Sequence, residues 1–146
     1  MSLSGIDVQI EPLTLTVHDG QSPWSDESWD EDHLHVVAEI DLAGQSWVRV
    51  AGSFLTMRDI ASFLDELRQL HQQDGRMAEL GSFGPAFILR LAGSSTGSIA
   101  AHLKLTPDIL TQTHTFELQL DQTHLPGIIR QLDTILERFP VRGRPD

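Results

Sequence analysis

Apolar and polar residues alternate along two neighbouring segments, and this period of two is the strongest constraint on the fold. The residues predicted to face the core in both segments carry even numbers: Leu34, Val36, Ala38, Ile40, Leu42, Val48, Val50 and Phe54. Such alternation is typical of strands with one face on a core. A three-residue loop, Ala43 to Gln45, keeps both apolar sets on the same face and places Arg49 opposite Glu39. The two segments are therefore predicted to form an antiparallel hairpin.

The period changes to that of a helix directly after this hairpin. Apolar residues recur at helical spacing, namely Ile60, Phe63, Leu64, Leu67 and Leu70. Thr56 and Asp59 have the spacing of a capping box, so we predict a helix from about Met57 to His71. A second apolar stripe from Leu125 to Phe139 predicts a final helix, which Pro140 ends.

Three more segments alternate with period two, over residues 86–92, 98–105 and 114–120. Near the N-terminus the apolar phase switches at Pro12, which predicts a bulge or two short edge strands. The predicted fold is α+β in the order β-β-β-α-β-β-β-α, with about six strands in one curved antiparallel sheet and two amphipathic helices on one of its faces. Residues 1–140 are expected to form a single domain, and 141–146 a flexible tail.

The charge of the chain is lopsided, with 21 acidic and 10 basic residues and a net charge of −11. Such a field repels nucleic acids and anionic membranes and attracts a cationic partner. The absence of cysteine excludes disulfides and thiolate metal sites. No apolar run reaches the roughly 20 residues of a membrane span, and no signal peptide pattern is visible, so we expect a cytoplasmic protein.

The segment from Ser22 to Val36 is the most unusual part of the chain. It contains Trp24 and Trp29 together with five acidic residues, Asp26, Glu27, Asp30, Glu31 and Asp32. One interpretation is a solvated loop whose indoles fold back over a sheet edge. The other is an acidic docking surface with tryptophan anchors.

Two sequence features favour an enzyme instead of a binding surface or a solvated loop. His33 and His35 lie on one strand face, where Asp30 or Asp32 would add oxygen ligands for a metal-dependent hydrolase. The sequence GSSTG, with Ser95 at its centre, matches a nucleophile elbow but is followed by a strand pattern instead of a helix. No cofactor-binding motif is present, and the acids fall on predicted polar faces. We therefore expect a non-enzymatic protein without a cofactor, with the His33/His35 hydrolase or an oligomeric scaffold as alternatives.

The two predicted helices resemble a known family. Their matching residues are Asp59, Phe63 and Leu67 in the first helix and Asp121, Gln122, Leu125, Leu132 and Pro140 around the second. Over about Trp29 to Pro140 the chain is similar to the WapI-type immunity proteins of bacterial polymorphic toxin systems. The resemblance implies a protein that binds and neutralises a toxin domain, often a nuclease, whose phosphate-binding cleft is commonly basic.

The leading hypothesis is therefore an acidic inhibitor that occludes the site of a basic toxin domain. Its expected contact residues combine the acidic segment with the polar face of the predicted hairpin, and they are Trp24, Asp26, Glu27, Trp29, Asp30, Glu31, Asp32, Glu39, Asp41, Trp47 and Arg49. The sequence leaves the oligomeric state open.

Overall fold

A computed structural model describes residues 8–10, 12–19, 33–43, 45–72, 76–81, 86–94 and 96–138 of the chain. The elements in chain order are β1 (Val8–Ile10), β2 (Leu13–Asp19), β3 (His33–Asp41), β4 (Trp47–Thr56), α1 (Met57–Gln72), β5 (Met77–Leu80), β6 (Phe87–Gly93), β7 (Ser98–Asp108), β8 (Gln112–Asp121), the 3₁₀ helix η2 (Gln122–His124) and α2 (Leu125–Arg138). The α+β class is confirmed.

The strands form two four-stranded antiparallel sheets, so the prediction of a single six-stranded sheet is wrong. The strand orders are β1-β2-β3-β4 and β5-β6-β7-β8, and each sheet is a simple meander. Helix α1 separates the two meanders, and the chain starts a new sheet at β5 instead of returning to pair with β4. The sequence analysis missed two of the eight described strands. β5 has only four residues, and the phase switch at Pro12 is the tight turn of a β1–β2 hairpin, in which Ile10 pairs with Leu13.

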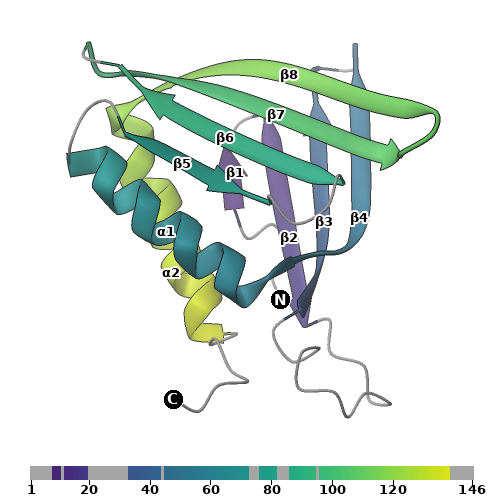
Figure 1. Ribbon diagram of the computed structural model, residues 1–146, viewed down its shortest axis with the longest axis horizontal. Coiled ribbons are helices and arrows are strands. Elements are labelled where there is room, and N and C mark those ends of the chain that lie inside the picture. The colour runs from purple at the N-terminus through teal and green to yellow at the C-terminus, as the bar shows by residue number, and fades with distance from the viewer. Residues whose placement is uncertain are drawn as a thin grey trace.

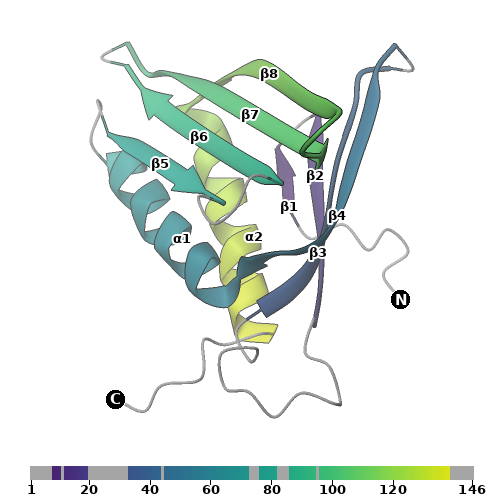
Figure 2. The ribbon, with the colours of Figure 1, turned by 45° about the vertical axis from the view of Figure 1, so that its right-hand side comes forward.

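The two sheets and two helices enclose one core. In Figure 1 the strands of the first sheet run close to vertical and those of the second sheet run across them. Both helices lie on the same side of the sheets (Figure 2), where α1 contacts β5 and α2 contacts β1. Phe63 of α1, Phe87 of β6 and Leu13 of β2 are all fully buried in this core.

The register of the β3–β4 hairpin agrees with the predicted loop. Glu39 pairs with Arg49 and Asp41 with Trp47. The N–H of Leu42 donates to the carbonyl of Ser46 across the turn at 2.8 Å. Leu42 was expected in the core, but it is exposed because it lies at the tip of the hairpin, beyond the core.

A β-bulge between Leu34 and Val36 changes the phase of the β3–β4 ladder. Val36, Val48 and Val50 are buried as predicted, but beyond the bulge the odd-numbered Leu55 is buried. The side chains of Leu34 and Phe54, both predicted for the core, lie outside the described residues.

The helix ends follow the local sequence signals. The hydroxyl of Thr56 accepts a hydrogen bond from the Asp59 N–H, and the Asp59 carboxylate accepts one from the Thr56 N–H, both at 3.0 Å. This capping box confirms the predicted start of α1. At the start of η2, Asp121 accepts from the Thr123 N–H at 2.9 Å, so Asp121 caps the turn that leads into α2. The predicted tail, residues 141–146, lies outside the described residues.

Candidate functional site

The outer face of the first sheet carries the described part of the predicted contact surface. Asp41, Trp47 and Arg49 are exposed and Glu39 is half-buried. The Trp47 side chain is 61% exposed although it is a large indole. Exposed indoles on a sheet face are typical of residues that anchor a protein–protein interface.

Trp47 is held in place by Glu39. Its indole Nε1 donates a hydrogen bond to Oε2 of Glu39, the diagonal neighbour across the β3–β4 ladder. Arg49 lies directly opposite Glu39 as predicted. Among the described residues, however, no ion pair joins the two side chains, because the carboxylate of Glu39 faces the indole instead. The guanidinium of Arg49 is therefore exposed beside an oriented tryptophan.

The acidic segment is the other part of the predicted contact surface. Trp24, Asp26, Glu27, Trp29, Asp30, Glu31 and Asp32 all lie outside the described residues. The segment connects Asp19 to His33, and Asp19 pairs with Leu34 at the start of β3. Asp41 and Trp47 lie at the other end of β3, about 26 Å away at roughly 3.3 Å per residue. The points where the acidic segment leaves and re-enters the sheet are thus far from Trp47.

The enzymatic motifs do not form an assembled site among the described residues. His35 is exposed, the side chain of His33 is outside the description, and the part of the chain that is described contains no group of three residues suited to a metal ion. Ser95 is also outside the description, but its flanking residues form a hairpin turn, in which the Ser94 N–H donates to the Ser98 carbonyl at 3.0 Å. A turn between two strands lacks the helix that a nucleophile elbow needs.

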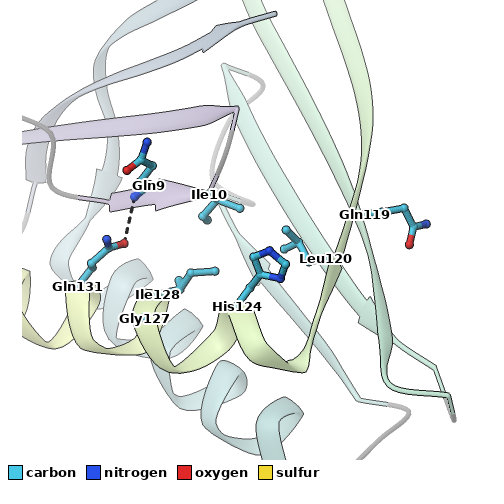
Figure 3. Close-up of a pocket in the computed structure, with 8 residues that line it drawn as sticks. All are labelled: Gln9, Ile10, Gln119, Leu120, His124, Gly127, Ile128 and Gln131. Carbon is cyan, nitrogen blue, oxygen red and sulfur yellow. Dashed lines mark hydrogen bonds between the residues drawn. The ribbon is translucent and has the colours of Figure 1, made fainter.

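A cleft of about 310 Å³, which the sequence analysis missed, lies where β1, β8 and α2 meet (Figure 3). Its lining residues are Gln9, Ile10, Gln119, Leu120, His124, Gly127, Ile128 and Gln131. They come from distant parts of the chain, so no local pattern could have revealed them. Amide groups dominate the polar part of the lining, and His124 is the one titratable side chain among the described residues that line it. The cleft can exchange hydrogen bonds, but the described lining pairs this imidazole with no nucleophile or second acid.

His124 at the rim of this cleft serves the helix start. Its Nδ1 accepts from the Asp121 N–H at 3.1 Å, which completes a capping box with the Asp121 side chain. Hydrogen bonds from the side chain and the N–H of Thr123, together with a smaller contribution from His124, hold the pKa of the Asp121 carboxyl below its ordinary value of 3.8. The imidazole therefore has a structural role at the start of η2.

Several acids elsewhere are partly balanced by the protein's own cations. Arg90 pairs with Glu79 at 2.7 Å on the second sheet, and Arg68 pairs with Asp133 at 2.8 Å between the two helices. These pairs are exposed and contribute little to stability. Neither pair lies on the outer face of the first sheet, where the exposed Trp47 makes the stronger candidate site.

The model of the immunity protein WapI-like family matches residues 3–140 of the chain. The chain belongs to the WapI-like immunity protein family. The match confirms the resemblance and extends it to the first strands. No curated protein and no solved structure matches the chain.

Membership implies that this WapI-like immunity protein neutralises a toxin and binds a cognate toxin protein. Immunity proteins act by binding, which agrees with the non-enzymatic expectation. Among the described residues, neither helix is long and apolar enough to cross a membrane.

Proposed function

We propose that this WapI-like immunity protein inhibits a basic toxin domain in the cytoplasm by occluding its active site. The observation that carries the proposal is the exposed indole of Trp47, held by Glu39 on the outer face of the first sheet beside Asp41 and Arg49. A fixed aromatic side chain loses little conformational entropy when it becomes buried against a partner. Polar neighbours around it would form the rim of the interface.

The net charge of −11 supports a basic partner. A negative field accelerates the approach of a positively charged protein, and the effect falls as salt screens it. Asp26, Glu27, Asp30, Glu31 and Asp32 are concentrated within seven residues, and Trp24 and Trp29 offer further anchors. In this proposal the acidic segment steers association, whereas the Trp47 face holds the complex.

Co-expression tests the proposal directly. A candidate toxin domain, sought among the genes that neighbour this one, is expressed with and without the protein, and survival is scored together with binding of the purified pair. We expect protection and a stable complex. Association rates are then measured for the triple variant Asp30→Arg, Glu31→Arg and Asp32→Arg, which should associate more slowly and with a weaker salt dependence.

The matched control is the triple variant Asp65→Arg, Glu137→Arg and Asp146→Arg, which changes net charge equally at other sites. An equal loss of association rate in both triple variants would assign the steering to total charge. Absence of any complex with the toxin would contradict the proposed function itself.

A further inference from the structure

Two of the four sheet edges are capped by side chains from the helices. At the edge of the first sheet the Gln9 N–H donates to Oε1 of Gln131 at 3.0 Å. At the edge of the second sheet the Glu79 N–H donates to Oε1 of Glu66 on α1 at 2.9 Å. Backbone groups of an edge strand would otherwise be open to pairing with another chain. Each helix therefore occupies a backbone N–H of one edge strand, α2 on β1 and α1 on β5.

The edge formed by β8 has no such cap. Within the described residues, the backbone of Thr113–Leu120 pairs only across the ladder with β7. Figures 1 and 2 show β8 as the last strand of its sheet, and only its C-terminal end, at Gln119 and Leu120, faces β1 and α2 across the cleft of Figure 3. The remaining edge strand, β4, differs because it lies against β7. Among the described residues, the part of β8 from Thr113 to Leu120 thus presents N–H and C=O groups without a backbone partner on one side.

Apolar surface accompanies this free edge. The inward-facing residues of β6 and β7 are buried, but Phe116 and Leu118 of β8 are only half-buried against the core. At the tip that precedes β8, Ile109 is 70% exposed and Leu110 is 88% exposed. The tip is held by Asp108, whose carboxylate accepts from the Leu110 N–H at 2.9 Å. One more strand beside β8 would cover apolar side chains that the chain itself leaves open.

We infer that the free edge of β8 accepts an extended segment of the cognate toxin as an added strand. This inference rests on the proposed function and names a second contact of the same complex. Strand addition draws affinity from main-chain hydrogen bonds and specificity from alternate side chains. The residues of the added strand that face Phe116 and Leu118 are apolar.

Charge complementarity defines the other face of the added strand. The side chain of Glu117 is 79% exposed on the outer face of β8, with the His102 imidazole 3.8 Å away. An Arg or Lys directly across from Glu117 would form a favourable cross-strand pair. The occupant is therefore a toxin segment in which apolar residues alternate with polar residues that include a base.

Amide hydrogen exchange of the purified complex with the toxin domain tests this inference. Amides of β8 that point away from β7 should exchange at least tenfold more slowly in the complex, in an alternating pattern. The amides of Gln9 and Glu79 serve as controls because side chains already cap them. Glu117→Arg should weaken binding about tenfold, whereas Glu137→Arg on α2 should leave it unchanged.

A complex that forms with unchanged exchange along β8 would overturn the inference while leaving the proposed function intact. Absence of a complex would overturn both. Sedimentation of the protein alone is the second measurement. A dimer in which β8 amides are already protected would assign the edge to a second copy of this chain and overturn the assignment to the toxin.

Discussion

The backbone N–H of Gln9 on β1 lies 3.0 Å from Oε1 of Gln131 on α2, and these residues are 122 positions apart in the chain. The same helix supplies Arg138, whose guanidinium donates to the Val17 carbonyl of β2 at 3.2 Å. Helix α2 therefore contributes to the core with its apolar stripe and also closes the edge of the first sheet.

Gln131→Ala should lower the free energy of unfolding by about 0.5–1.5 kcal/mol, because it removes the acceptor of an edge N–H. Chemical denaturation measures the change. Gln119→Ala is the matched control, since Gln119 lines the same cleft from β8 and is exposed. Equal effects of both substitutions would show that the hydrogen bond to Gln9 contributes nothing measurable.

Gly81→Ala should lower the free energy of unfolding by about 2–4 kcal/mol through backbone strain and overpacking. Gly81 has φ +91°, and an added Cβ would lie 2.3 Å from the Phe87 carbonyl oxygen. Gly127→Ala is the opposite case, because its Cβ would meet nothing closer than Arg130 Nη2 at 3.9 Å in α2. It should raise stability by about 0.5–1 kcal/mol. Thermal and urea unfolding of the pair measure the difference, and a tolerated Gly81→Ala would contradict the close approach.

Thr106→Val should stabilise the protein by about 1–2 kcal/mol, because it replaces a hydroxyl that is buried without compensation. Thr106 is buried at the irregular end of β7, and its Oγ1 has no hydrogen-bond partner among the described residues. Thr113→Val, at an exposed position on β8, is the control and should change stability far less. A loss of stability in Thr106→Val would indicate that the hydroxyl has a partner.

Asp121 should contribute a pH-dependent part of the stability. Its folded pKa lies below 3.8, so the contribution is present at pH values above 3.8 and disappears as pH falls through the lower folded pKa. Asp121→Asn should therefore be less stable than the wild type near neutral pH. The two stability curves should converge in strong acid, below pH 3.8. Parallel curves across that range, measured by urea unfolding, would show that the charge of Asp121 does not matter.

Trp47→Ala should weaken toxin binding by about 2 kcal/mol, or roughly 30-fold, because it removes an exposed anchor. The free protein should keep its stability, since Trp47 packs on the surface. Met77→Ala is the control, because Met77 is 55% exposed and belongs to the second sheet. Calorimetric titration of both variants with the toxin domain provides the comparison. Unchanged affinity of Trp47→Ala would remove this face from the interface.

Local sequence signals were sufficient for the helices and for the pairing of neighbouring strands. The stripe from Ile60 to Leu70 and the Thr56–Asp59 box predicted α1, because both depend on residues within a few turns. The register of Glu39 with Arg49 followed from parity, because a shift of one residue would turn Val48 and Val50 out of the core.

Only the tertiary structure decided the division into two sheets, the capped and free edges, and the partner of Glu39. These features depend on contacts between residues far apart in the chain, such as Gln9 with Gln131, and period-two alternation looks the same in one sheet or two. The sequence by itself determined both helices, most of the strands with most of their inward faces, and the family, because these are carried by local periodicity and residue type. Which strand edge stays open was determined by where α1 and α2 dock, and docking is a property of the assembled core.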